Sequence, residues 1–533
     1  MYIIIHMYYI WKEWFCMNKE LDKILLDEIP YIKECGNKFI NKEMSKMEFK
    51  GISGRFGVYA HRDGKEFMIR LRTSCGVISK KQLHIIYNLA SKYKLDKIHL
   101  TTRQAVQLHG LSIDNICNIM KEALLEGIYT RGGGGDFPRN VALSPLSGVN
   151  ENEVFDVTPY AIACDKYFLK KIYTYKLPRK LKVSFSNNNN DSAHCTVQDL
   201  GFVATKENNK NYFKVFFGGG LGRNPAVSIE FPELIDPKDV LYHIEAITQL
   251  FIHEGNYENK SKARVRYITE KLGKDGFISE YKKYLSELKA KGDLDLHIEE
   301  INYEKQGVNL DLTHKRLFKQ KQEGLYSVYI KPIGGILYLK DLKKVLDFID
   351  NVSNVMIRST MEEGFYILNL NGNEAREFLR ITENLGGETS LEQSVCCIGV
   401  PICQMGVLES QTELNKIINY FKEKNFKKDV LPSIHISGCP NSCGAHEIAG
   451  IGLVGKKKRV DGKLLDIFEL HLGGHLNIPG TSLAKVYGDI PTNKIPELLY
   501  KFALEVDKSN LDFSTWLKNN EDLAKEIISK YAV

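Results

Sequence analysis

Two long stretches of the chain share one pattern of hydrophobic and polar positions. Residues 67–90, FMIRLRTSCGVISKKQLHIIYNLA, and residues 327–350, SVYIKPIGGILYLKDLKKVLDFID, each begin with alternating apolar residues, pass a glycine turn and continue with apolar residues at helical spacing. This pattern predicts a strand, a turn and a helix. Each stretch is followed by one further predicted strand, at residues 97–111 and 355–370, and then by a second helix. The chain therefore repeats itself.

A second pair of similar segments follows these. Residues 197–222 contain VQDLGFVA and YFKVFFGGGLG, and residues 447–477 contain EIAGIGLVG and IFELHLGGHLN. We interpret the chain as two copies of one two-part unit, joined near the polar residues 300–325. The predicted architecture is a small α+β sandwich followed by a larger α/β lobe, and then the same pair again.

The two copies differ in their chemistry. A duplicated scaffold keeps its core wherever packing demands it, but it needs its chemistry only once. The first copy has cations where the second has none or fewer, and the second has thiols where the first has the loop SNNNND. We therefore expect one composite site between the copies. The aligned pairs are Arg70 with Tyr329, Arg72 with Lys331, Arg103 with Met361, Asn188 with Cys439 and Ser192 with Cys443.

Length and composition indicate a large globular protein. The chain has 533 residues, of which 43% are hydrophobic, and this is enough for roughly three to four domain-sized units. The formal charge of +7 is modest, and the absence of a long basic block argues against a nucleic-acid-binding arm. The charge fits a small anion or an acidic protein partner. The 11 irregularly spaced cysteines do not resemble a secreted disulfide framework, so we expect a reducing cytoplasm.

The N-terminus, MYIIIHMYYIWKEWF, is apolar but too short to span a bilayer, and it has no basic leader and no cleavage site. We expect no membrane association, and we interpret residues 1–16 as an appendage. A translation start at Met17 would remove them and leave an amphipathic opening helix. N-terminal mass spectrometry tests this hypothesis.

Four thiols occur in two irregular segments of the second copy. SVCCIGVPICQMG contains a Cys-x5-Cys spacing, in which Pro401 disfavours a helix, and HISGCPNSCGAHE contains a Cys-x3-Cys spacing. Soft thiolates on two loops are the ligands that a cubane 4Fe-4S cluster requires, and no second knuckle supports a zinc finger. Cys396 is interpreted as a packed neighbour. The predicted cluster ligands are Cys397, Cys403, Cys439 and Cys443, and the other cysteines, Cys16, Cys35, Cys75, Cys117, Cys164 and Cys195, are expected to be inert.

Cys-x5-Cys together with SGCPNSCG resembles the sirohaem-containing, ferredoxin-dependent nitrite and sulfite reductase family of the single-chain duplicated type. The order of the repeated units is similar to that family over nearly the whole chain after residue 50. The resemblance implies an α+β fold, mixed with α/β, in which two ferredoxin-like half-domains and two sirohaem and 4Fe-4S lobes are related by pseudo-twofold symmetry. It also implies that Cys443 is the axial ligand of the sirohaem iron. The implied domains are an N-terminal extension and helix (1–50), the first half-domain (51–130), the first, sirohaem-binding lobe (131–300), the second half-domain (301–388) and the second lobe, with cluster and sirohaem (389–533).

Cationic and polar residues of the first copy lie on shared faces of predicted strands. If LTTRQAVQLHG is one strand, alternation places Arg103, Gln107 and His109 on the same face. Each of these residues alone is typical of a solvated surface, but together they predict a pocket for a strongly anionic molecule. Sirohaem carries eight carboxylates, which guanidinium groups are suited to bind. In the family, residues that match Arg70, Arg139, Lys180 and Lys182 contact the substrate, and the macrocycle is held by residues that match Arg72, Arg103, Gln107 and His109.

Two glycine- or lysine-rich segments are interpreted as turns. The run Gly132–Gly135 is not followed by Lys and Ser or Thr, so it is not a phosphate-binding loop, and we expect a flexible turn. The segment GKKKRVDGK, residues 455–463, is expected to be a solvated hairpin, with docking of an electron donor as the alternative.

The resemblance implies a six-electron reductase of sulfite, nitrite or both, supplied by a small acidic carrier such as ferredoxin. Lys182 favours sulfite, because nitrite-directed relatives of the plant type tend to have Asn there. Phe137 stands where some sulfite-directed relatives have a Cys that is crosslinked to Tyr, so we expect no such crosslink. Two alternatives are nitrite as the main physiological substrate, and a non-catalytic iron-sulfur electron carrier or sensor on the same scaffold.

Overall fold

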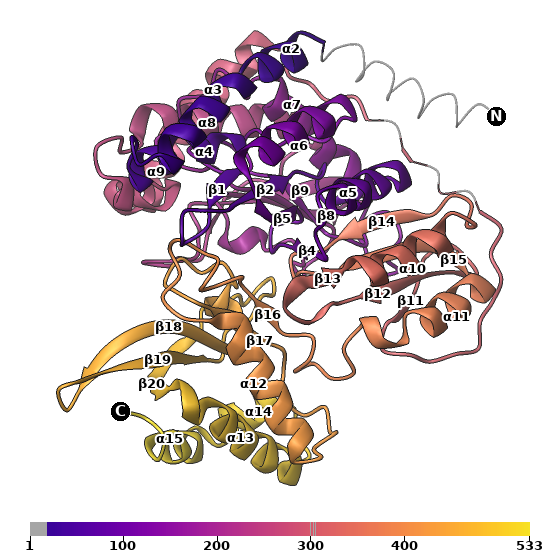
Figure 1. Ribbon diagram of the computed structural model, residues 1–533. Coiled ribbons are helices and arrows are strands. Elements are labelled where there is room, and N and C mark those ends of the chain that lie inside the picture. The colour runs from indigo at the N-terminus through magenta and orange to yellow at the C-terminus, as the bar shows by residue number, and fades with distance from the viewer. Residues whose placement is uncertain (1–18, 299, 302, 304) are drawn as a thin grey trace.

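Four mixed or antiparallel sheets of five strands each form the framework of the protein (Figure 1). The computed structural model describes residues 19–298, 300, 301, 303 and 305–533. The predicted appendage of residues 1–16, the inert Cys16 and the alternative start at Met17 lie outside the described residues. Within the described part of the chain, no helix is both long enough and apolar enough to cross a membrane.

The first small sandwich begins with helices that cover one face of its sheet. Phe67, Ile69 and Leu71 alternate with more accessible residues along β2 and are fully buried. A capping box between Ser79 and Gln82 begins the helix that follows. The elements are α2 (Lys19–Asp27), α3 (Ile29–Ile40), α4 (Lys46–Ser53), η1 (Gly54–Phe56), β1 (Val58–Ala60), β2 (Phe67–Leu71), β3 (Val77–Ile78), α5 (Lys80–Lys92), β4 (Lys97–Leu100), β5 (Val106–Leu111) and α6 (Ile113–Leu125).

The second small sandwich has the same order of elements. They are β11 (Leu317–Lys319), β12 (Leu325–Ile330), β13 (Ile336–Tyr338), α10 (Leu339–Ile349), β14 (Met356–Ser359), β15 (Phe365–Asn371) and α11 (Gly372–Ile381). A capping box of Asn371 and Glu374 begins α11.

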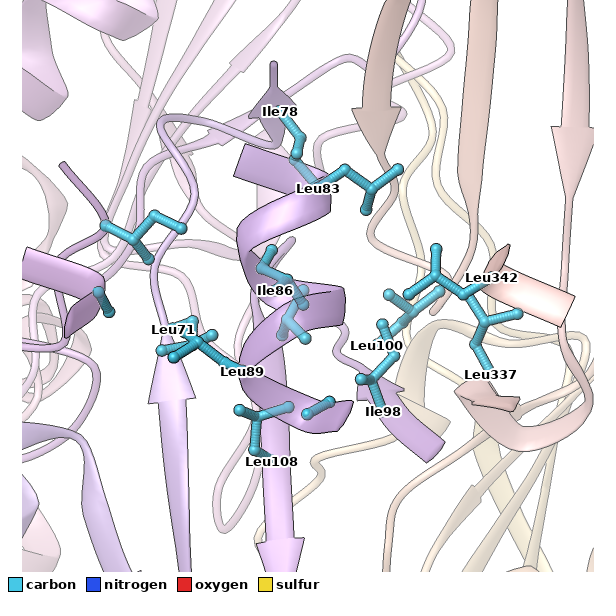
Figure 2. Close-up of a cluster of buried hydrophobic side chains, with 14 of the residues drawn as sticks. Leu71, Ile78, Leu83, Ile86, Leu89, Ile98, Leu100, Leu108, Leu337 and Leu342 are labelled. Carbon is cyan, nitrogen blue, oxygen red and sulfur yellow. The ribbon is translucent and has the colours of Figure 1, made fainter. Parts of the chain in front are cut away.

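The two small sandwiches exchange a strand. The first sheet has the order β1-β2-β5-β4-β13 and the second has the order β11-β12-β15-β14-β3, so each contains a short strand of the other copy. Leu337 of β13 pairs with Ile98 of β4, and both lie in one apolar cluster with Leu100 (Figure 2). The exchange makes the two sandwiches one shared core, and the sequence pattern alone does not predict it. The domain boundaries stay a prediction.

The two larger lobes also repeat one topology. In each, three parallel strands are followed by two antiparallel ones, in the orders β10-β9-β8-β7-β6 and β16-β17-β18-β19-β20. The first lobe contains β6 (Ala142–Leu143), α7 (Thr158–Lys170), β7 (Val183–Ser186), η2 (Cys195–Val197), β8 (Leu200–Glu207), β9 (Lys210–Phe217), β10 (Ile229–Glu230), η3 (Pro237–Asp239), α8 (Val240–Glu254), η4 (Lys260–Lys262) and α9 (Val265–Lys291). The second contains β16 (Val395–Cys396), α12 (Ser410–Glu423), β17 (Ile434–Ser437), η7 (His446–Ile448), β18 (Ile451–Val460), β19 (Lys463–Leu472), β20 (Lys485–Pro491), η8 (Thr492–Lys494), α13 (Ile495–Ser509), α14 (Phe513–Asn519) and α15 (Glu521–Ser529).

The sequence pattern predicted one strand at residues 97–111, but the structure has two strands there. The segment forms β4 and β5, and the five-residue turn between them is closed by the hydrogen bond from Thr101 N–H to the Ala105 carbonyl, at 3.0 Å. Arg103 therefore lies in a turn and not on a strand face with Gln107 and His109. The matching turn of the second copy is closed from Thr360 to Gly364 at 2.9 Å. By position in these turns, Arg103 corresponds to Glu362, so the predicted pairing of Arg103 with Met361 is wrong.

Candidate functional site

Four thiols of the second lobe lie on two loops that follow neighbouring parallel strands. One loop joins β16 to α12 and the other joins β17 to η7. Gly438 connects the loops, because its N–H donates to Sγ of Cys397 at 3.1 Å and its carbonyl accepts from the N–H groups of Val407 and Leu408 at 2.8 and 2.9 Å. The four thiols are Cys397, Cys403, Cys439 and Cys443.

These thiols influence one another electrostatically. Burial raises the pKa of Cys397 to about 12 and that of Cys439 to about 11, and a charge on Cys443 adds to both shifts. Burial and then Cys443 raise the pKa of Cys403 in the same direction. Cys443 is thus within electrostatic range of the other three thiols, and bound metal would stabilise the thiolate forms.

The donor set fits a cluster better than a single ion. Among the residues that the structure describes, no group of three or more His, Cys, Asp or Glu side chains is placed to hold one metal ion. In a cubane cluster each thiolate binds a different iron, so the four sulfur atoms do not have to meet at one point. Four neighbouring soft donors on irregular loops therefore fit a 4Fe-4S cluster.

The first lobe has polar residues at the corresponding positions. Asn188 follows the end of β7 by the same interval at which Cys439 follows the end of β17, and the loops end in the matching helices η2 and η7. Ser144, which follows β6 as Cys397 follows β16, is hydrogen-bonded to Ser192 at an Oγ–Oγ distance of 2.7 Å. Two serines thus contact each other where the second lobe has Cys397 and Cys443.

The thiol-bearing loops contact the first copy directly. The hydroxyl of Thr102, in the turn between β4 and β5, donates to the carbonyl of Cys443 at 2.8 Å. Arg62 donates its backbone N–H to the Ile402 carbonyl at 3.0 Å and its guanidinium to the Gly406 carbonyl at 2.7 Å. The loops that carry the thiols are therefore held against the sandwich that carries the predicted cations.

Arg70, Gln107 and two histidines form a polar group on the first sheet. Gln107 pairs with Arg70 across β5 and β2. With its amide oxygen toward Arg70, Gln107 accepts from Nε at 3.1 Å and from Nη2 at 2.6 Å, and its nitrogen donates to Nδ1 of His99 at 2.9 Å and to Nε2 of His109 at 3.2 Å. Burial lowers the pKa of His99 to about 4, and burial followed by the charge on His99 lowers that of His109, so both rings are neutral at pH 7.

The glycine run Gly132–Gly135 surrounds two of the predicted substrate cations. Arg70 donates to the carbonyl of Gly133, and Arg139 donates to the carbonyls of Gly134 and Gly135, the latter at 2.7 Å. A Cβ atom on Gly134 would lie 2.0 Å from the hydroxyl of Tyr59, so only glycine fits there. The run is therefore a packed turn that directs its carbonyls to the arginines, and not the flexible turn that the sequence predicted.

Lys180 and Lys182 lie among other cations on the stretch that leads into β7. Burial lowers the pKa of Lys180 to about 7, and the charges of Arg264 and Arg139 lower it further, whereas a thiolate at Cys443 would raise it. Burial and then Lys180 lower the pKa of Lys182 well below its usual range. Lys180 is therefore within electrostatic range both of Arg264 and Arg139 and of the thiol of Cys443.

Arg264 and Asp199 support this stretch, and the sequence did not single them out. Asp199 accepts from Nε and Nη2 of Arg264 at 3.0 and 2.8 Å, and from the backbone N–H of Lys182 at 2.8 Å. The carboxylate of Asp199 is fully buried, so its charge is balanced by these donors. Both residues were missed because they are 65 positions apart in the chain and belong to no motif.

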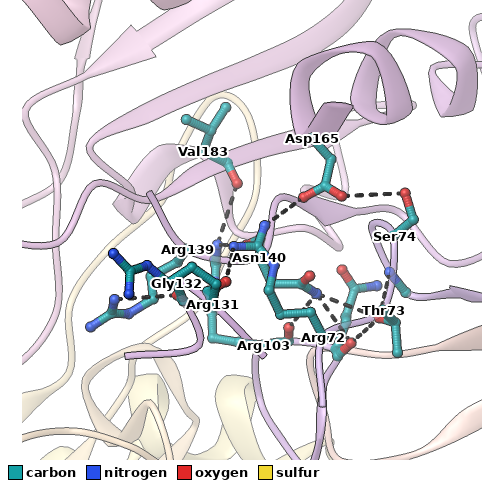
Figure 3. Close-up of polar contacts among 12 residues, drawn as sticks. Arg72, Thr73, Ser74, Arg103, Arg131, Gly132, Arg139, Asn140, Asp165 and Val183 are labelled. Carbon is teal, nitrogen blue, oxygen red and sulfur yellow. Dashed lines mark hydrogen bonds and ion pairs between the residues drawn. The ribbon is translucent and has the colours of Figure 1, made fainter. Parts of the chain in front are cut away.

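Arg72 and Arg103 have different environments (Figure 3). Arg72 forms a buried ion pair with Asp165 of α7 at 2.8 Å, which ties the first sandwich to the first lobe. Arg103 donates to Gln198 Oε1 at 3.3 Å and to the carbonyl of Asn140. Burial, followed by the charge of Arg139, lowers the pKa of Arg103 to about 9, and the charge of Asp199 offsets this lowering only in part.

Several buried nitrogen atoms in this region have no hydrogen-bond partner among the described residues. They include Nε of Arg103, Nδ1 of His109 and Nε2 of His99. Buried donors of this kind are costly unless something accepts from them. A polycarboxylate such as sirohaem would supply the missing acceptors, so the residues of this region fit that group.

Three lysines of the β18–β19 hairpin are paired with acidic residues. Lys457 contacts Asp466 at 2.6 Å and Lys458 contacts Asp489 at 2.8 Å, while Lys456 contacts Glu469. This pairing fits the expected solvated hairpin, and a partner that docks there would have to compete with these acids.

Comparisons with known proteins agree with this arrangement. The profile of the "Nitrite/Sulfite reductase ferredoxin-like half domain" matches residues 59–125, and that of the "Nitrite and sulphite reductase 4Fe-4S domain" matches residues 134–289. The second match covers the lobe with Ser144 and Ser192, and not the lobe with the four thiols.

Whole-chain relatives have related names. An assimilatory ferredoxin-dependent nitrite reductase of Haloferax mediterranei is 24% identical over 83% of this chain and 80% of its own length. A ferredoxin sulfite reductase of Mycolicibacterium paratuberculosis is 26% identical over 83% of this chain and 82% of its own length. The structure of the Mycobacterium tuberculosis NirA protein matches 96% of this chain and 97% of its own, with a TM-score of 0.78 at 23% identity, and it shows the same fold. Residues 59–125 and 134–289 thus match domain models of nitrite and sulphite reductases, and the chain is similar to proteins named for either activity.

Proposed function

We propose that this protein is a sirohaem- and 4Fe-4S-dependent reductase that converts sulfite to sulfide, nitrite to ammonium, or both. Sulfite takes up six electrons and seven protons and gives hydrosulfide and three waters. Nitrite takes up six electrons and eight protons and gives ammonium and two waters. Both reactions start from a small anion and consume many protons, so the site has to bind negative charge and supply protons.

The observation that carries the proposal is the contact between the four-thiol loops and the cationic part of the first copy. Thr102 binds the carbonyl of Cys443 at 2.8 Å, and the charge of Cys443 influences the pKa of Lys180. A metal centre on the thiols would therefore lie beside the cations. A non-catalytic electron carrier has no use for this group of cations, so the structure favours an enzyme.

The roles follow the chemistry of each group. Four thiolates would hold the cluster, and Cys443 would also ligate the sirohaem iron. The sirohaem, when bound, supplies an iron at which the anion is reduced. Proposed substrate contacts are Arg70, Arg139, Lys180 and Lys182; Arg72, Arg103, Gln107 and His109 are proposed to hold the macrocycle.

The cations have two tasks toward the anion. Guanidinium groups of Arg70 and Arg139, held by the glycine carbonyls, stabilise its negative charge in a partly buried site. A lysine crowded by cations gives up its proton readily, so Lys180 and Lys182 are suited to donate protons to the oxygens that leave as water.

The electron donor is proposed to be ferredoxin or a similar acidic one-electron carrier, as the names of the relatives state for those proteins. We also propose a cytoplasmic location, because every cysteine that the structure describes is free. Lys182 supports sulfite as a substrate, and relatives named for either anion support both.

Absorption spectroscopy and turnover of the purified holoenzyme test the proposal. We expect a sirohaem spectrum that changes when sulfite or nitrite is added, and turnover of at least one anion with reduced methyl viologen. The ratio of kcat/KM for the two anions identifies the preferred substrate. A protein with iron and sulfide but without a sirohaem spectrum and without turnover would support the electron-carrier alternative.

A further inference from the structure

A partly buried ion pair connects the N-terminal helices to the residue that precedes the glycine run. Nη1 of Arg131 donates to Oε2 of Glu28 at 2.9 Å, and the Arg131 side chain is only 5% exposed. Glu28 lies between α2 and α3. The Arg131 guanidinium also lies between two aromatic rings, 5.0 Å from the centroid of Phe56 and 5.1 Å from that of Phe137. Three attractive contacts thus fix one side chain.

These contacts hold both ends of the glycine run. Arg131 precedes Gly132, and Phe137 follows Gly135 by two residues. In addition, Gly132 donates its N–H to the carbonyl of Arg55 at 2.9 Å, next to Phe56. Four successive glycines lose more backbone entropy on ordering than any other four residues, so a fixed conformation has to be imposed from outside the run.

The conformation of the run determines where the substrate arginines lie. Its carbonyls accept from Arg70 and Arg139, as described above. Beyond the run, Arg139 donates its backbone N–H to the carbonyl of Leu181 at 2.8 Å, and Leu181 lies between Lys180 and Lys182. One short segment therefore leads from the ion pair of Arg131 and Glu28 to all four proposed substrate contacts.

We infer that Glu28, Arg131 and Phe137 form a clamp that positions Arg70 and Arg139 for the substrate anion, so that helices α2 and α3 take part in substrate binding without touching the substrate. The inference rests on the proposed function. Arg131 is a positioning residue, because its side chain contacts Glu28, Phe56 and Phe137 and not the reacting atoms.

The test uses three variants of the holoenzyme. Arg131→Met removes the ion pair and the cation, Glu28→Gln removes only the ion pair, and Arg131→Lys keeps a cation at the same place. Misplaced arginines weaken binding of the anion in the ground state and the transition state alike, so KM should rise while kcat changes little. For Arg131→Met we expect KM of the preferred anion to rise about tenfold, with kcat within about twofold of the wild type.

Spectral titration gives a second readout that does not depend on turnover. The Kd of the anion, read from the shift of the sirohaem absorption, should rise in parallel with KM in Arg131→Met. It should rise by about threefold in Glu28→Gln and by less in Arg131→Lys, because a lysine still pairs with Glu28 and still lies against the rings. Lys33→Met is the matched control. It breaks an exposed ion pair at 2.8 Å between Lys33 of α3 and Asp114 of α6, and it should leave KM and Kd unchanged.

The outcomes separate the inference from the proposed function. A lower melting temperature with unchanged KM and Kd in Arg131→Met would overturn the clamp and leave a purely structural ion pair. If Arg131→Met does not fold, unchanged KM and Kd in Glu28→Gln would overturn it equally. Absence of turnover and of anion binding in the wild-type holoenzyme would instead overturn the proposed function.

Discussion

At the scale of single residues, the site brings together several positively charged side chains, and burial makes their charged forms unfavourable. Lys180, Lys182, Arg103 and Arg139 all have a pKa below the ordinary value, with burial as the largest cause and neighbouring cations as an additional one. Such a group is stabilised when an anion binds, and the stabilisation grows with the charge of the anion. This argument separates a sulfite dianion from a nitrite monoanion.

Lys182→Asn should therefore change the substrate preference. The variant removes a group that a dianion keeps protonated more strongly than a monoanion does. We expect the ratio of kcat/KM for sulfite to that for nitrite to fall about tenfold, which corresponds to about 1.4 kcal/mol. Steady-state kinetics with reduced methyl viologen measure the ratio. Lys176→Asn, at an exposed position, is the control, and an unchanged ratio in Lys182→Asn would remove the reason for preferring sulfite.

A second residue-scale prediction concerns Glu413, which lies on α12 with Oε2 at 3.7 Å from Nζ of Lys416. It is 2% exposed, Oε1 has no hydrogen-bond partner among the described residues, and burial raises its pKa from 4.5 to about 7. Because the folded pKa exceeds the unfolded one, the carboxyl lowers the free energy of unfolding as the pH rises from about 4.5 to 7, and the loss is complete above pH 7. Its size is about 1–3 kcal/mol.

Glu413→Gln removes this charge. The melting temperature should rise relative to the wild type at pH 8 and change little at pH 5, where the carboxyl is protonated in the folded state. Thermal melting at both pH values measures the difference. Glu423→Gln, on the exposed side of the same helix, should change neither value, and an equal effect of Glu413→Gln at both pH values would show that burial of the charge is not the cause.

At the scale of elements, the duplicated topology explains what the sequence could predict. Alternation and helical spacing identified both copies, and the α+β duplicated fold class is confirmed. The spacing placed Cys397 with Cys403 and Cys439 with Cys443, each pair within one loop, but it did not show that Gly438 joins the two loops, and the cluster stays a prediction. The prediction that Arg103 shares a strand face with Gln107 and His109 was wrong, because alternation does not show where a strand ends. The chain turns at Gln104, which has a φ of 54°.

The corresponding loops of the two lobes allow a test of the cluster. Cys443→Ser introduces the residue that the first lobe has at the matching position, Ser192. Because the corresponding loop of the first lobe accommodates a serine at this position, we expect the secondary structure to stay unchanged. Most of the iron should be lost, and the absorption of the cluster and that of the sirohaem should disappear together. Iron analysis and absorption spectra measure this.

Ser192→Ala is the matched variant in the first lobe. It breaks the 2.7 Å contact with Ser144 and should cost about 1 kcal/mol of stability while the iron content stays that of the wild type. If Cys443→Ser retained its iron, or if Ser192→Ala lost it, the assignment of the cluster to the second lobe would be wrong.

At the scale of the whole molecule, the exchange of β3 and β13 couples the copies. Each of these strands has only two or three residues, too few for a period to be read from the sequence, and its partner lies in the other copy. The composite site depends on this coupling, because the turn with Thr102 directly follows β4, the strand that pairs with β13. The sequence thus predicted that the site is composite, but it did not predict that exchanged strands hold the two copies together.

Because the two copies share a core, we expect a substitution in one copy to increase hydrogen exchange in the other. Leu337 of β13 is 2% exposed and packs with Ile98 and Leu100 of the first copy and Leu342 of the second (Figure 2). Leu337→Ala should cost about 2–5 kcal/mol, because it leaves a cavity in this shared core. Hydrogen exchange should then become faster in β4 and α5 as well as in α10, on both sides of the exchange. Tyr338→Ala, at a 45% exposed position of the same strand, should change exchange in none of them. Faster exchange confined to α10 would mean that the sandwiches unfold independently, and that the contact between thiols and cations is maintained by the lobes alone.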